Sequence, residues 1–99
     1  MNRFFSEEQC VGSIQLESGA AEVFAAIDAE YHADQHQVVV ERKAFLSPDD
    51  MQHIGEHLQP DWLPQGGCVK AGCGETEASD VASDIFHSWV RHVRESIPR

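Results

Sequence analysis

The sequence predicts an α+β fold, in which two or three strands pack against about three helices and a long amphipathic helix ends the chain. Two observations lead to this prediction. Apolar residues alternate or form a β-branched run in short segments of the first half, whereas they recur with helical spacing in the last quarter. A chain of 99 residues, 41% of them hydrophobic, also fits a small single domain over residues 1–99.

The first element is expected over residues 7–17, where two interpretations remain open. From residue 10 onward the residues alternate as in a strand, and one face would consist of Cys10, Gly12, Ile14 and Leu16. The preceding run Ser6-Glu7-Glu8-Gln9 also fits a capping box, in which a serine begins a helix and a later side chain returns the hydrogen bond. A helix is therefore the alternative here.

A second element, a helix, is predicted after Ser18, which is a favourable N-cap residue. Its apolar face would consist of Ala20, Val23, Phe24, Ile27 and Tyr31. The opposite face is rich in alanine and would let another chain approach closely. The β-branched run within residues 37–43 then predicts a strand. Strand, helix and strand in this order imply a crossover, which is right-handed if the strands are parallel neighbours.

A third, short helix is predicted to begin at Ser47, because Pro48 suits the first helical turn and Asp50 can complete a capping box. Pro60 would end it. Prolines and glycines predict a loop over residues 61–67, and a third strand is expected near residues 68–71.

The final helix is the clearest element. Its apolar residues cover about half of a helical wheel on the 100° spacing of an α-helix, and they are Val81, Ala82, Ile85, Phe86, Trp89, Val90, Val93 and Ile97. Acidic residues lie toward its start and Arg91 and Arg94 toward its end, as the helix dipole favours. A start at Thr76, Ser79 or Asp80 and an end before Pro98 are expected.

Charge is the most informative bulk property. The chain has 17 Asp and Glu against 7 Lys and Arg, for a net charge of −10. Eight of the acidic residues, and no Lys or Arg, lie between Phe4 and Glu41. So few cations argue against nucleic acid and anionic membranes as direct ligands. The sequence therefore predicts an acidic surface for a basic protein partner, and the alternative is that the charge serves solubility alone.

We expect a small binding protein that occludes the Lys and Arg of a basic, nucleic-acid-binding protein, as an inhibitor, an immunity-type or antirestriction-like protein, or an escort. The predicted contact residues are Glu17, Glu22, Asp28, Glu30, Asp34 and Trp62. Trp62 lies in the expected loop between two prolines, as an interface anchor would. Its alternative is a lid over the core. The alanine-rich face and the wide final helix permit a homodimer.

Two other classes of function stay open as alternatives. The spacing of Cys68, Cys73, His87 and His92 fits a structural Cys2His2 zinc site, although His87 and His92 fall on different faces of the final helix. A cysteine-dependent enzyme is the second alternative. His53-Ile54-Gly55-Glu56-His57 matches a zinc peptidase pattern, but such enzymes need a much larger fold. We therefore expect no catalytic residue, no cofactor and no metal ion.

The N-terminus carries Arg3 but no apolar run after it, so neither a secretory signal nor a membrane-spanning helix is expected. The three cysteines are too few for a secreted disulfide scaffold. We expect a cytoplasmic protein with free thiols.

Overall fold

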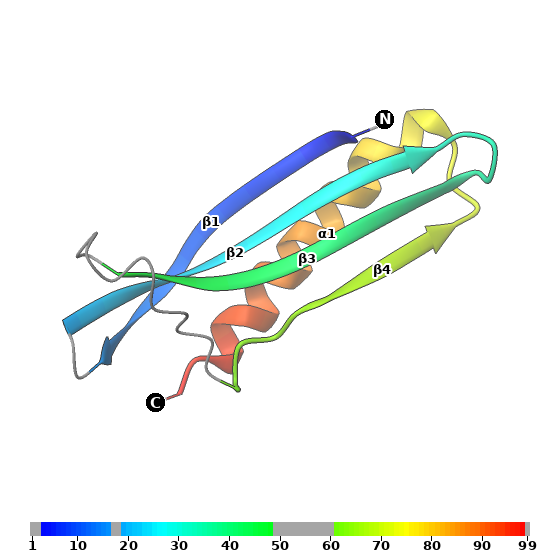
Figure 1. Ribbon diagram of the computed structural model, residues 1–99. Coiled ribbons are helices and arrows are strands. Elements are labelled where there is room, and N and C mark those ends of the chain that lie inside the picture. The colour runs from blue at the N-terminus through cyan, green and yellow to red at the C-terminus, as the bar shows by residue number, and fades with distance from the viewer. Residues whose placement is uncertain (1–2, 17–18, 49–60, 99) are drawn as a thin grey trace.

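A computed structural model describes residues 3–16, 19–48 and 61–98, in which a four-stranded antiparallel sheet packs against one α-helix (Figure 1). The strands are adjacent in chain order, β1-β2-β3-β4. Their bounds, with that of the helix, are β1 Arg3–Leu16, β2 Gly19–His32, β3 Gln37–Pro48, β4 Gly66–Ala71 and α1 Glu75–Ser96. The predicted arrangement of two or three strands with about three helices is therefore wrong.

The predicted second helix is strand β2. Its buried side chains alternate, each at most 1% exposed, and are Ala21, Val23, Ala25, Ile27 and Ala29. Val23 and Ile27 fit both a helical and a strand period, so the segment is ambiguous from apolar spacing alone. Ala21, Ala25 and Ala29 form a strip on the face that α1 covers, where the helix buries its own Ala78 and Ala82.

Strand β1 confirms the strand interpretation of residues 7–17 as far as Leu16, and the helix alternative is wrong. The side chains of β1 do not alternate regularly along the whole strand, because its register with β2 shifts between Cys10 and Gly12. Such a β-bulge moves the following side chains to the other face of the sheet. Cys10 therefore pairs with Phe24, whereas Gly12 pairs with the buried Val23, and the bulge residue Val11 is only 7% exposed.

Strand β3 confirms the strand predicted over residues 37–43 and continues to Pro48. Leu46, Ser47 and Pro48 pair with β2, so a helix does not begin at Ser47 as predicted. The rest of that predicted helix, residues 49–60, lies outside the described residues. Strand β4 confirms the strand expected near residues 68–71. All three pairings are antiparallel, so the predicted crossover is also wrong.

Helix α1 confirms the predicted C-terminal helix and begins at Glu75, directly after the N-cap Gly74. It lies across one face of the sheet (Figure 1) and buries Ala78, Ala82, Phe86, Trp89, Val90 and Val93 against it. Ile97 lies beyond its end on Gly12, where a Cβ atom would come within 2.8 Å of the isoleucine Cδ1. Glycine at this position therefore lets the end of the helix approach β1.

A four-residue turn joins β2 to β3, in which Gln35 N–H donates to the His32 carbonyl. His36 ends the turn in the left-handed region, with φ of 51°. The chain entering α1 is tied to this end of the sheet, because Cys73 N–H donates to the His36 carbonyl at 2.9 Å. The Tyr31 hydroxyl donates to the Cys73 carbonyl at 3.3 Å. The start of α1 is thus fixed by hydrogen bonds as well as by apolar packing.

Candidate protein-binding surface

Helix α1 covers one face of the sheet, and no other described element covers the opposite face (Figure 1). We call this opposite side the outer face. Because side chains alternate along a strand, the even-numbered residues of β2, which alternate with its buried ones, point to the outer face. Three predicted contact residues, Glu22, Asp28 and Glu30, are among them. The structure therefore brings these three onto one surface, although it does so on a strand.

The neighbouring strands add two carboxylates to the outer face. Glu8 of β1 lies beside Ala26, and Glu41 of β3 lies beside Asp28. The carboxylates of this surface, which we call the acidic face, are Glu8, Glu22, Asp28, Glu30 and Glu41. From Glu22 to Glu30 the strand rises by about 27 Å at the usual 3.4 Å per residue. The acidic face is thus long enough for a protein interface.

Lys43 is the one lysine or arginine among the side chains that the structure describes on the acidic face. Its Nζ atom lies 3.4 Å from Glu41 Oε1 and 3.7 Å from Asp28 Oδ2. The Lys43 side chain is 50% exposed, and exposed ion pairs of this kind contribute at most about 1 kcal/mol. A cation from another protein can therefore compete with Lys43 for the same carboxylates.

A hollow of about 450 Å³ opens on the acidic face above the small side chain of Ala26. Glu8, Asp28, Lys43 and Phe45 are among the residues that line it. Ser6 Oγ–H donates to Asp28 Oδ1 at 2.7 Å, which orients this carboxylate at the edge of the hollow. The hollow has the charge and the size to accept a Lys or Arg side chain from a partner.

Next to this hollow, Phe24 and Phe45 stack on the outer face with ring centroids 5.3 Å apart and an angle of 6° between the rings. Both rings are half-buried, with no described helix or strand above them. Further along the sheet, Val69 of β4 is 56% exposed and lies beside Val39. Apolar side chains left open beside charged ones are typical of a protein-binding surface.

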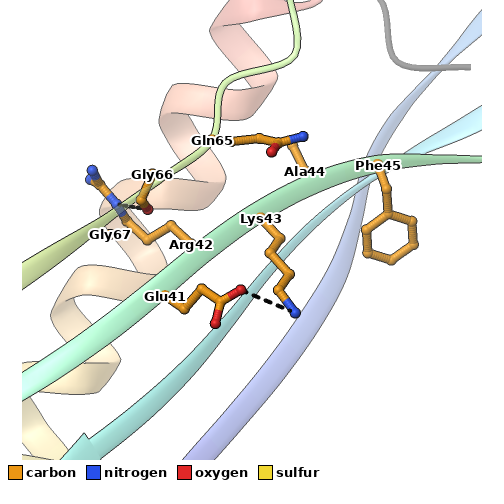
Figure 2. Close-up of a pocket in the computed structure, with 8 residues that line it drawn as sticks. All are labelled: Glu41, Arg42, Lys43, Ala44, Phe45, Gln65, Gly66 and Gly67. Atoms are coloured by element: carbon orange, nitrogen blue, oxygen red, sulfur yellow. Dashed lines mark hydrogen bonds and ion pairs between the residues drawn. The ribbon is translucent and has the colours of Figure 1, made fainter.

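A second hollow of about 470 Å³ adjoins the acidic face where β4 begins (Figure 2). Figure 2 shows Glu41 and Lys43 turned toward each other on one side of β3, and Arg42 turned away toward Gly66. The hollow forms because β4 pairs with β3 only as far as Arg42. The backbone of β3 beyond that residue has no β4 residue beside it.

The other predicted contact residues lie elsewhere. Asp34 is exposed in the turn between β2 and β3, and Glu17 lies outside the described residues. Trp62 is half-buried and packs against the core beside the buried Leu63, as expected of a lid. Glu8, Glu41 and the Phe24–Phe45 pair also lie on this surface and were not predicted from the sequence as contact residues. Alternation along residues 19–32 was the signal that could have placed Phe24 on this face, and Phe45 lies opposite it on β3.

The structure does not assemble the zinc pattern. Among the described residues, no three His, Cys, Asp or Glu side chains come together in a way that could hold a metal ion. Cys73 is buried, Cys68 is half-buried and Cys10 is exposed on the outer face. His92 packs on Trp89 with ring centroids 5.5 Å apart. The pattern at His53 lies outside the described residues.

Comparison of this chain with protein-family models, with curated proteins and with solved structures gives no significant match. Within the described part of the chain, no helix combines the length and the apolar character of a membrane span.

Proposed function

We propose that this chain is a small protein-binding module whose acidic face docks on a basic partner protein. By covering the Lys and Arg of that partner it would inhibit or escort it. The observation that carries the proposal is the open sheet face itself, on which five carboxylates share one surface with a stacked aromatic pair and a single described lysine.

The aromatic pair and the carboxylates would do different things in the complex. Electrostatic attraction speeds association and fixes orientation more than it adds affinity. Aromatic side chains at the centre of an interface usually supply a large part of the binding energy. We expect the partner to place an apolar side chain on Phe24 and Phe45 and a Lys or Arg in the hollow above Ala26, where it would meet Glu8 and Asp28.

The test uses two triple variants of equal charge change. The first carries Glu22→Gln, Asp28→Asn and Glu30→Gln on the acidic face. The control carries Glu77→Gln, Asp80→Asn and Glu95→Gln, which replace exposed residues of α1. Proteins are captured from native lysate at low salt on the immobilised full chain and on both variants. A true partner binds the wild type and the control and is lost from the acidic-face variant.

A purified partner then allows affinity measurements over a range of salt concentrations. We expect the acidic-face variant to bind at least tenfold more weakly, with a shallower salt dependence. Lys43→Gln is expected to strengthen binding about two- to fivefold, because it removes the cation that competes for Asp28 and Glu41. Equal loss in both triple variants would mean that only total charge matters. Full binding by the acidic-face variant would refute the proposal.

A further inference from the structure

The side of the sheet that carries α1 has a cleft of its own, between β4 and the helix. Its volume is about 310 Å³. Arg42 and Lys70 bring two cations to it, Ser88 brings a hydroxyl, and Val81 and Ile85 form an apolar wall from α1. In a chain of net charge −10, a concave site with two cations calls for a chemical explanation.

Neither cation has an ion-pair partner among the residues that the structure describes. Lys43 forms two ion pairs, but Arg42 and Lys70 form none with any described residue. Asp84 also lines the cleft without coming within ion-pair distance of either cation. Two positive charges and one negative charge give the cleft a net charge of about +1, which a single monoanion would balance.

Arg42 is held in place by its surroundings. Its Nε–H donates to the Gly66 carbonyl at 3.1 Å, and its guanidinium carbon lies 4.9 Å from the centre of the Trp89 ring. These contacts leave the terminal nitrogens of the guanidinium as donors and restrict the movement of the side chain. An arginine fixed in this way loses little conformational freedom on binding a carboxylate.

We propose that this cleft binds a small monocarboxylate with an apolar body. The carboxylate would accept hydrogen bonds from Arg42 and form an ion pair with Lys70. The apolar body would lie on Val81 and Ile85. Asp84 disfavours dianions such as phosphate because it adds a like charge beside them. A second cleft of about 290 Å³ shares Arg42 and Ser88 and is also lined by His92, so a longer body has room to extend that way.

The proposal is tested by NMR titration of the full-length chain with hexanoate as the probe. Acetate tests binding of the carboxylate alone, and hexanol tests binding of the apolar body alone. Phosphate tests whether the cleft prefers a small dianion. We expect hexanoate to shift amides of residues 66–70 and 84–89 with millimolar affinity and to bind at least threefold more tightly than each of the other three compounds. Hexanol binding as well as hexanoate would overturn the role of the cations, and phosphate binding more tightly would overturn the preference for a monocarboxylate.

Two variants assign the site to these residues. Lys70→Gln removes an exposed cation that no described residue pairs with, so the fold is expected to be unchanged and hexanoate to bind three- to fivefold more weakly. Lys43→Gln, the matched control on the outer face, should bind hexanoate like the wild type. Equal effects of both variants, or none from Lys70→Gln, would overturn the proposal. Because this test ignores the acidic face, it stands or falls separately from the proposed docking function.

Discussion

Replacing Trp89 with phenylalanine tests how the helix closes the open edge of β3. Trp89 is 3% exposed, and its indole N–H donates to the Lys43 carbonyl at 2.7 Å. Lys43 lies one residue beyond the last residue of β3 that pairs with β4, so the indole takes the place of a missing strand partner. Phenylalanine keeps an aromatic ring under Arg42 but cannot donate this hydrogen bond.

The expected loss can be summed from the contacts. The hydrogen bond contributes about 1 kcal/mol, the smaller ring leaves a cavity that costs about 1–2 kcal/mol, and a weaker cation–π contact with Arg42 costs about 0.5 kcal/mol. Trp89→Phe is therefore expected to lower the free energy of unfolding by about 2–4 kcal/mol. Urea unfolding measures this as a midpoint lower by about 2 M, for a slope near 1.5 kcal/mol per M.

The matched control is Trp62→Phe, which changes a half-buried tryptophan that donates no hydrogen bond to a described residue. It is expected to cost about 1 kcal/mol or less. Arg42→Met, introduced into the wild type and into Trp89→Phe, completes a double-mutant cycle. This cycle should give a coupling of about 0.5–1 kcal/mol between Arg42 and Trp89. A loss below about 1 kcal/mol for Trp89→Phe would refute the reasoning, because the hydrogen bond and the buried ring together exceed that value.

Three further outcomes can be checked by thermal or urea unfolding. His36→Gly should raise the free energy of unfolding by about 0.5 kcal/mol, since glycine adopts the left-handed backbone without a steric penalty; an unchanged midpoint would contradict this. Gly72→Ala should lower it by about 1 kcal/mol for the opposite reason, because Gly72 has φ of 77°. Ala25→Leu should cost about 1–3 kcal/mol or more by forcing α1 away from the strip of alanines on β2, whereas a stable, unshifted protein would mean that the helix does not need this close approach.

The C-terminal helix could be predicted because its apolar residues repeat from Ala78 to Val93 within a helix of 22 residues, long enough for the helical period to differ clearly from any other. The β-branched run of β3 was equally clear. Both elements depend on local patterns alone. The residues that α1 buries include most of those predicted for its apolar face, with Ala78 added because the helix begins earlier than expected.

Strand β2 could not be predicted in this way because its character depends on its neighbour in space. Alanine favours helices in isolation, and tertiary context overrides this preference when a helix must lie close above the strand. The β-bulge at Val11 has the same origin. It allows Val11 to point into the core and Gly12 to contact Ile97. No pattern within the sequence of β1 alone predicts either contact.

Three of the predicted contact residues lie together on the candidate surface, although the secondary structure predicted for them was wrong. Glu22, Asp28 and Glu30 are separated by even numbers of residues, so a strand places them on one face. A helix with 100° per residue would have placed Asp28 about 120° from Glu22 and about 160° from Glu30 around its axis. The strand therefore concentrates charge that a helix would have spread over its circumference.

This concentration bears on whether the charge serves solubility alone. The exposed residues of α1 include both acids and bases, among them Asp80, Glu95 and Arg91. On the outer face, five carboxylates and one described lysine instead share a surface with Phe24 and Phe45, whose rings remain open to solvent in part. Solubility needs no aromatic pair, and open apolar area favours unwanted association. A surface that has both carboxylates and open aromatic rings is better explained by contact with a partner than by solubility alone. The two charge-matched triple variants distinguish these two explanations.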